Sequence, residues 1–467
     1  MKVDGKEDRW VTGVFVAVSG LLLFFNLWGR SLENHGYLRY AEVAREMIRS
    51  GDWIVPRLNG EVYLNKPPLL FWLIAIPSSL YGSVTPFLAK LPVVLSAWAG
   101  TLVVFFWGRR LYGSVRAGLI SGGILLSCYQ FWSQSRLAKT DILLALLFLL
   151  AFYFFTLGIE APTGKRTFYF LGSFCCMGLG VLTKGPFGFL IPFPILTVFL
   201  VKEKKTGLLL SRGFLLGYGL LVLMVLPWVS LFIQRIGFEE SLSLLKASHP
   251  FSRQAPFYFY FLEIWGQFFP WSLFLPSLAF SLWRDRSRTW NSTESLVLFW
   301  FILHFLALTF FKVRVSRYLL PILPALTLMM GGRWNRRLLF FLIPFVLMVS
   351  ALHIREFHWI RNDLRHSPGK VLAGELKPVL MDAPLMAYRL DASTLEELNF
   401  YLDPPQPISF MTDKDDLSTG LPGGKEIGIL TNEKGLEALQ AHGKGLVKPV
   451  KTFSYKKGRL VFAKFYG

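Results

Sequence analysis

Charged residues stand directly beside long apolar runs at several separate places in this chain. A single cation in such a position is explained by its side chain reaching towards lipid headgroups. Several cations on one side of a membrane instead suit a phosphate group, because clustered Lys and Arg recognise phosphate by charge-assisted hydrogen bonds. The residues placed in this way are Arg39, Lys66, Arg136, Lys139, Asp141, Lys184, His249, Arg253, Arg314 and Arg317.

The composition excludes an ordinary soluble domain. Hydrophobic residues make up 53% of the 467 residues and charged residues only 17%, and the mean hydropathy is +0.44. The class is therefore an integral membrane protein. The net charge of +20, from 50 Lys and Arg against 30 Asp and Glu, fits basic loops on the cytoplasmic side and an anionic lipid substrate. We expect no nucleic-acid partner.

The apolar runs predict a multi-pass helical protein. The first run has the length of a retained anchor, and residues 67–81, which contain Pro77, are too short to span and predict a re-entrant or interfacial segment. About eleven spans are expected, at residues 10–28, 86–107, 117–132, 142–157, 168–182, 187–201, 207–233, 259–283, 296–311, 319–330 and 338–352.

Basic residues on alternate connections predict the orientation of these spans. Because cytoplasmic loops are enriched in Lys and Arg, the amino terminus is expected inside, with residues 33–72 and the segment after residue 352 outside. The cations on the expected cytoplasmic connections are Arg109, Arg110, Arg116, Lys165, Arg166, Lys202, Lys204, Lys205, Arg212, Arg284, Arg286, Arg288, Arg333, Arg336 and Arg337.

The polar loop at residues 33–72 carries four short motifs in close order: RYAE from Arg39, SGDW from Ser50, PRLNG from Pro56 and NKPP from Asn65. One interpretation is a juxtamembrane amphipathic helix at residues 40–49 followed by an interfacial turn. The motifs also resemble the first periplasmic loop of the bacterial GT-C glycosyltransferases, which include the aminoarabinose-lipid A transferases and relatives of the protein O-mannosyltransferases. This resemblance covers roughly residues 10–352.

The resemblance implies an inverting transfer of a sugar from a polyprenyl-phosphate donor to a lipid, glycan or protein acceptor at the outer face of the bacterial inner membrane. The motifs SRLAKTD, LTKGP and SRYLLPILPAL, which end or begin near Asp141, Lys184 and Arg317, match family patterns near the active cavity. The residues expected to bind the donor phosphate are Arg39, Tyr40, Lys66, Lys139, Lys184, Arg317 and Tyr318. Those expected to serve the acceptor or an outer loop are His249, Arg253 and Glu263.

The sequence departs from these relatives at the expected acid. Relatives carry an Asp-Glu pair just before the RYAE motif, and here Gly36 and Tyr37 occupy those positions. The remaining candidates for a catalytic role are Glu33, His35, Glu42 and Asp141. Asn65 stands where some relatives have Glu, which argues against a divalent metal there. A phosphorylated acceptor would attack through its own anionic oxygen and need no strong base.

Two other functions compete with an active transferase. An inactive relative that acts as an assembly subunit would explain the missing acidic pair. A secondary transporter would show paired interrupted helices and polar residues at mid-membrane depth, whereas the charges here lie at the ends of the spans.

The composition changes after residue 352, and we expect a transmembrane domain at residues 1–352, with its first outer loop at 30–85, followed by a small extracytoplasmic α/β domain at 353–467. Short strands are predicted at residues 386–390, 408–411 and 427–430, with a hairpin at 451–463 that turns at Lys457 and Gly458. Helices are predicted at residues 394–401 and 434–442. Cys128, Cys175 and Cys176 lie in apolar runs and predict small buried residues without a disulfide.

Overall fold

The structure is a computed structural model. It describes residues 5–25, 27–28, 32, 38–247, 255–285, 290–311, 313–333, 368–379, 385–390, 392–402, 408–411, 427–442, 446–455 and 458–466. The chain divides into two compact units. The helical unit comprises residues 1–27, 64–74 and 90–355, and the loop-and-sheet unit comprises residues 28–63, 75–89 and 356–467.

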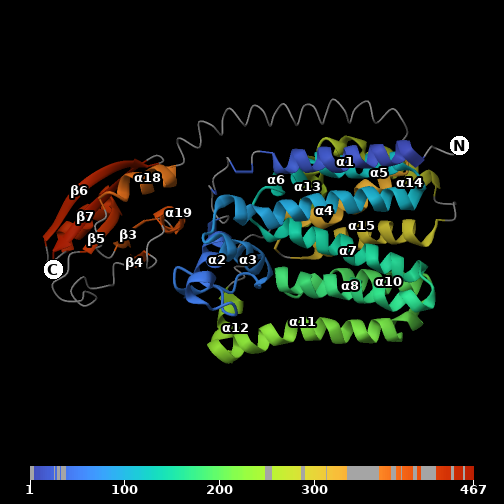
Figure 1. Cartoon of the computed structure of the whole chain (residues 1–467), viewed down its shortest axis with the longest axis horizontal. Coiled ribbons are helices and arrows are strands. Elements are labelled where there is room, and N and C mark those ends of the chain that lie inside the picture. Colours follow the sequence, from blue (N-terminus) through green and yellow to red (C-terminus); the bar gives the residue numbers. More distant parts are fainter. Residues whose placement is uncertain are drawn as a thin grey trace. The chain divides into compact units, whose positions relative to one another are not determined.

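The helical unit is made of helices joined by short connections (Figure 1). Five described helices, α4, α7, α8, α11 and α15, are long and apolar enough to cross a membrane. The helices of this unit, with α3 and α4 beginning or ending in the other unit, are α1 (Gly5–Phe24), α3 (Leu69–Tyr81), α4 (Pro86–Tyr112), α5 (Val115–Ser127), α6 (Tyr129–Gln134), α7 (Thr140–Glu160), α8 (Thr163–Lys184), α9 (Phe187–Leu190), α10 (Pro192–Lys202), η1 (Thr206–Leu210), α11 (Arg212–Ile236), α12 (Phe238–Ala247), α13 (Phe259–Gln267), η2 (Trp271–Phe274), α14 (Leu275–Arg284), α15 (Ser292–Phe310), η4 (Ser316–Ile322) and α16 (Leu323–Gly331).

The antiparallel pair of α7 and α8 lies at the centre of this unit. At 21 residues, α7 is about 31 Å long, which matches the thickness of a bilayer's hydrocarbon core. It packs against α8, and α8 packs against α11 on its other side. Since Asp141 lies in the first turn of α7 and Glu160 is its last residue, these two acids mark opposite ends of the helical unit.

The Glu160 end gathers the connections that the sequence predicts to be cytoplasmic. Glu160 forms an ion pair of 2.9 Å with Arg110 of α4 and accepts a 2.7 Å hydrogen bond from Thr293 of α15. Lys202 of α10 donates to Ser295 of α15 at 3.1 Å. At the end opposite Asp141, the basic ends of α4 and α10 are thus bound to α7 and α15.

Several of the predicted spans are divided into shorter helices. Residues 259–283 form α13, η2 and α14, because Pro270 and Pro276 cannot donate the backbone hydrogen bonds of one long helix. Residues 117–132 divide at Cys128, whose backbone is extended. Residues 319–330 begin in the 3₁₀ helix η4, which contains Pro321, and continue in α16, which has Pro324 in its first turn. The expected span at residues 338–352 lies outside the described residues.

The other spans agree better with the sequence. The predicted spans at residues 142–157, 168–182 and 296–311 fall within α7, α8 and α15 to within one residue. Residues 187–201 form α9 and α10 with a break at Ile191. The segment with Pro77 is the 13-residue helix α3, too short to span a bilayer.

The loop-and-sheet unit combines the first polar loop with the end of the chain. The loop forms α2 (Leu38–Ser50), which confirms the predicted helix, and a small hairpin of β1 (Arg57–Leu58) and β2 (Glu61–Val62). The rest of the unit is an α/β domain with α18 (Pro368–Leu376), β3 (Leu385–Tyr388), α19 (Ala392–Leu402), β4 (Ser409–Met411), β5 (Ile427–Asn432), α20 (Glu433–His442), β6 (Leu446–Tyr455) and β7 (Gly458–Tyr466).

The sheet of this domain has the strand order β4-β3-β5-β7-β6. The strand β3 is parallel to β4 and β5, and β7 is antiparallel to β5 and β6. Buried side chains of α18, α19 and the sheet, including Leu376, Leu398 and Leu430, form its core. The predicted strands, helices and hairpin are confirmed, with β6 longer than expected; the turn residue Lys457 lies outside the described residues.

We predict that Gly188→Ala destabilises the helical unit. A Cβ at Gly188 would stand 2.0 Å from the backbone carbon of Gly180 in α8, so the two segments would have to separate at a cost of about 1–3 kcal/mol. Thermal unfolding in detergent measures the effect. Gly219→Ala is the control, because a Cβ there meets no atom within 4 Å, and equal unfolding midpoints for both variants would contradict the prediction.

Candidate active site

The carboxylate of Asp141 joins two cations from distant parts of the helical unit. Its Oδ1 lies 2.5 Å from Nζ of Lys184, and its Oδ2 lies 3.2 Å from Nε of Arg317. The Asp141 side chain is 5% exposed, whereas that of Arg317 is 40% exposed. Asp141 is therefore the buried part of this cluster, and Arg317 is more exposed than Lys184, whose side chain is 13% exposed.

Helix ends place Asp141 and Lys184 next to each other. Asp141 lies in the first turn of α7, where the positive end of the helix dipole favours an acid. Lys184 is the last residue of α8, which ends because Gly185 adopts a φ of 73°. The chain then turns back, and Gly188 lies so close to Gly180 that a side chain at Gly188 would collide with the backbone of α8. This turn fixes the backbone at the end of α8, where Lys184 lies.

The 3₁₀ helix η4 supplies Arg317 and Tyr318. Its start is held by two side chains from other helices: Nε2 of Gln130 donates to the Ser316 carbonyl at 2.5 Å, and the Tyr260 hydroxyl accepts from the Val315 amide at 3.2 Å. Nζ of Lys184 lies 4.3 Å from the centre of the Tyr318 ring, within the range of a cation–π interaction. Lys184 thus contacts both an anion and an aromatic face.

Two further lysines belong to the same electrostatic cluster. The pKa of Lys66 is lowered to about 8, mainly by burial; the positive charges of Lys184 and Arg317 add to this shift, and Asp141 opposes it. Nζ of Lys66 donates to the backbone and side-chain oxygens of Asn65 at 2.7 and 2.8 Å. Burial also lowers the pKa of Lys139, with Arg317 adding to the effect.

The cluster carries an excess of positive charge. Its four cations, Lys66, Lys139, Lys184 and Arg317, interact with one described carboxylate, Asp141. Such an excess in a partly buried place is costly unless an anion compensates it. The arrangement suits a ligand with a phosphate group, which several Lys and Arg side chains hold by charge-assisted hydrogen bonds.

Two other predicted cations have structural partners instead. Arg136 is buried, and its Nη2 donates to the carbonyls of Leu22 at 2.8 Å and Phe25 at 3.1 Å, at the end of α1. Arg314 donates to the backbone carbonyls of Ala255 and Thr309. Arg136 donates to carbonyls at the C-terminal end of α1, and Arg314 donates to one near the end of α15 and to that of Ala255. The carbonyls at the ends of helices lack donors within the helix.

Three predicted residues from the first part of the loop, Arg39, Tyr40 and Glu42, belong to the other unit. Nε of Arg39 lies 2.6 Å from Oε1 of Glu396 in α19. Glu42 is 1% exposed and forms an ion pair with Arg45, which is the environment of a structural acid. Tyr40 is buried in α2.

The other predicted site residues divide between the described and undescribed parts of the chain. Glu263 in α13 accepts a 3.0 Å hydrogen bond from Gln267, one helical turn later. Glu33, His35, His249 and Arg253 lie outside the described residues. Within the part of the chain that the structure describes, no group of three or more His, Cys, Asp or Glu could hold a metal ion, and the Asn65 side-chain oxygen bonds to Lys66.

Sequence reasoning missed Gln130, Tyr260 and Glu396. The first two lie in apolar stretches where a polar group needs a hydrogen-bond partner, and that was their only signal. Glu396 stands in an unremarkable helical segment, and its partner Arg39 is 357 residues away. No local pattern could have identified it.

Comparison with known proteins gives matches over most of the chain. The family described as dolichyl-phosphate-mannose-protein mannosyltransferase matches residues 65–231. A protein of Aquifex aeolicus is 29% identical over 321 residues, which are 68% of this chain and 62% of that protein. The undecaprenyl phosphate-alpha-4-amino-4-deoxy-L-arabinose arabinosyl transferase of Edwardsiella ictaluri is 28% identical over 70% of this chain and 60% of its own length. The matched part therefore spans less than two thirds of either relative.

The fold is similar to that of solved transferases. The crystal structures of ArnT from Cupriavidus metallidurans, in the apo state and bound to undecaprenyl phosphate, superpose on this chain with TM-scores of 0.79 and 0.78. Each match covers 98% of both chains at 21% sequence identity. An oligosaccharyltransferase from Archaeoglobus fulgidus matches with a TM-score of 0.55 over 87% of this chain and 64% of its own. The chain has the GT-C fold.

We predict that Asp141→Asn destabilises the helical unit by about 2 kcal/mol, because Lys184 and Arg317 lose the carboxylate between them. Thermal unfolding of the detergent-solubilised protein measures this loss. Glu433→Gln, which breaks the exposed pair of Glu433 and Arg459, should leave the unfolding midpoint nearly unchanged. An unfolding midpoint in Asp141→Asn equal to that of the parent would show that the carboxylate does not hold the cluster.

Proposed function

We propose that this chain, which has the GT-C fold and is similar in sequence to aminoarabinose transferases, is a glycosyltransferase that takes its sugar from a polyprenyl-phosphate donor. The single observation that carries this proposal is the cluster around Asp141, where four cations and one carboxylate gather at one end of the membrane-length helices α7 and α8. A lipid-borne phosphate is a ligand whose charge suits these cations and whose lipid tail suits a site at the end of membrane-length helices.

The cluster would bind the phosphate of the donor and stabilise it as it leaves. In the reaction, an acceptor oxygen forms a bond to the anomeric carbon while the bond from that carbon to the phosphate oxygen breaks, which inverts the anomeric centre. The electron pair of the broken bond goes to the phosphate, so negative charge develops there. Lys66, Lys139, Lys184 and Arg317 are placed to stabilise that charge, which is often the largest contribution to catalysis of this kind.

Asp141 would act by positioning rather than as a base. Its two oxygens already contact Lys184 and Arg317, and a carboxylate engaged by two cations has little affinity for a proton. It would keep both cations at the distance a phosphate needs. The proton of the acceptor then goes to another group or to the departing phosphate, unless the acceptor is itself a phosphorylated sugar whose anionic oxygen attacks.

The alternating basic connections support an outer location for this site. The Arg110 and Lys202 end of the helical unit would face the cytoplasm, so Asp141 would lie near the periplasmic surface of the inner membrane, together with the carboxy-terminal domain. The acceptor would be a lipid, a glycan or a protein. Arg39, Tyr40 and Tyr318 remain proposed contacts of the donor, and Glu263 remains a proposed contact of the acceptor.

We predict that Lys184→Ala lowers the release of undecaprenyl phosphate from an undecaprenyl-phosphate-linked aminoarabinose on the order of 100-fold, as expected for a lost charge-stabilising donor. The measurement is turnover of the purified protein in lipid nanodiscs with a lipid A acceptor. Lys165→Ala, an exposed lysine at the opposite end of α8, is the matched control and should keep full activity.

The same assay separates the competing functions. Turnover that both variants retain would reject the site. No release by the parent protein from several polyprenyl-phosphate sugars, with lipid, glycan and protein acceptors present, would reject the enzymatic function and favour an inactive relative.

We predict that affinity for undecaprenyl phosphate falls as the pH rises from 7 to 9.5. The charged form of Lys66 binds phosphate, and because its pKa in the free protein is about 8, more of the lysine is neutral at each higher pH. Above that pKa, binding must include uptake of a proton, with a limiting loss of about tenfold per pH unit for one such group. Lys66→Arg should flatten this dependence, and Lys165→Arg should not; an unchanged slope in Lys66→Arg would contradict the assignment.

A further inference from the structure

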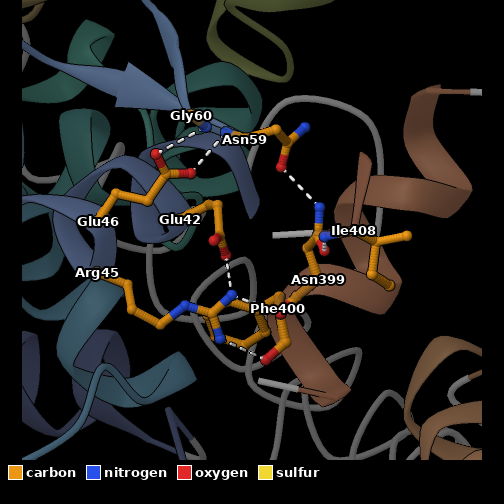
Figure 2. A network of polar contacts seen from close by, with 8 residues as sticks. All are labelled: Glu42, Arg45, Glu46, Asn59, Gly60, Asn399, Phe400 and Ile408. Atoms are coloured by element: carbon orange, nitrogen blue, oxygen red, sulfur yellow. Dashed lines mark hydrogen bonds and ion pairs between the residues drawn. The ribbon is translucent and has the colours of Figure 1, made fainter. Parts of the chain in front are cut away.

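The first polar loop and the carboxy-terminal domain share one buried polar network. Figure 2 shows its residues, which come from α2, the β1–β2 turn and α19, together with Ile408 just before β4. Nη1 of Arg45 donates to the Phe400 carbonyl at 2.9 Å, and Nη2 donates to the Asn399 carbonyl at 2.5 Å. The same guanidinium pairs with Glu42 and lies over the Phe400 ring.

Asn399 uses both ends of its side-chain amide in this network. Its Nδ2 donates to Oδ1 of Asn59 at 2.7 Å, and its Oδ1 accepts from the Ile408 amide at 2.8 Å. Asn399 is fully buried. On the loop side, Glu46 accepts from the amides of Asn59 and Gly60 at 2.5 and 3.1 Å, so the turn that receives Asn399 is itself fixed to α2.

These contacts make the loop and α19 dependent on each other. A buried polar group that loses its partner retains the full cost of leaving water, about 1–3 kcal/mol for each group. Without α19, the guanidinium of Arg45 and the amide oxygen of Asn59 would lose these partners. Contacts with α19 therefore stabilise the observed conformation of the loop.

Arg39 lies on the same face of α2, two turns before Glu46. Its Nε contacts Glu396 at 2.6 Å; the Arg39 side chain is 35% exposed and that of Glu396 is 5% exposed. Glu396 holds the guanidinium through one of its five N–H groups, and the side chain of Tyr63 is a second hydrogen-bond partner. The exposed remainder of a guanidinium is the part that can bind another anion.

We propose that Glu396 and Asn399 of α19 are positioning residues for sugar transfer: Glu396 orients the guanidinium of Arg39 towards an anionic oxygen of the donor, and Asn399 fixes the loop that carries Arg39. This inference rests on the proposed function for the identity of the anion. It gives the carboxy-terminal domain a part in the reaction. The domain and the loop are far apart in the sequence: 340 positions separate Asn59 from Asn399.

Binding of undecaprenyl phosphate to the full-length protein in nanodiscs tests the role of Glu396. We expect Glu396→Gln and Arg39→Gln each to weaken binding about tenfold, the effect of losing one charge-assisted contact. If Glu396 acts through Arg39, the double variant binds no more weakly than Arg39→Gln alone. Glu437→Gln, which removes an exposed charge from α20 of the same domain, is the control and should bind like the parent.

Hydrogen exchange tests the role of Asn399 without relying on the ligand. Asn399→Leu should speed exchange in residues 38–50 and 57–62, whereas Asn432→Leu, which alters a different turn of the same domain, should not. Parent-like binding by Glu396→Gln, additive losses in the double variant, or unchanged exchange in Asn399→Leu would overturn the inference. A parent protein that binds no undecaprenyl phosphate would refute the proposed function instead, and the exchange measurement would still decide whether α19 holds the loop.

Discussion

The contact of one carboxylate with two cations is the constraint on which the candidate site depends. Lys184 and Arg317 come from separate segments of the chain, and both reach Asp141. Two positive charges that contact the same partly buried carboxylate repel each other strongly. The negative charge of Asp141 between them offsets this repulsion. Because Asp141 offsets only part of the charge, the cluster stays attractive to an anion. A second acid would stabilise the empty site further and weaken its affinity for phosphate.

Much of the helical unit follows from the sequence because lipid imposes strict rules on the backbone. A helix must satisfy its own hydrogen bonds in a bilayer, so long apolar runs such as α7 and α8 could be placed to within a few residues. The rule fails where prolines interrupt a run. Pro270 and Pro321 divide segments whose hydrophobicity alone predicts single helices, and the resulting short elements supply irregular backbone in the interior, including the segment with Arg317.

The sequence predicted those residues of the candidate site whose charged side chains stand directly beside long apolar runs. Lys184 and Asp141 stand at the ends of spans, and the sequence identified both. The sequence could not separate Arg136 and Arg314 from them, because all four are cations or acids beside apolar runs; only the structure shows that these two arginines cap backbone carbonyls. The pairing of α2 with α19 was equally hidden, since hydrogen bonds between residues 340 or more positions apart leave no local pattern.

The distance along the chain between Arg45 and its partners in α19 has a consequence for biosynthesis. About 350 residues separate Arg45 from Asn399, and at a translation rate of about 5–20 residues per second the second partner emerges roughly 20–70 seconds after the first. During that interval most of the membrane helices are made, while the arginine has no α19 carbonyls to receive its hydrogen bonds. These hydrogen bonds therefore form late, and a chain that ends before α19 would lack them even after all its helices are inserted.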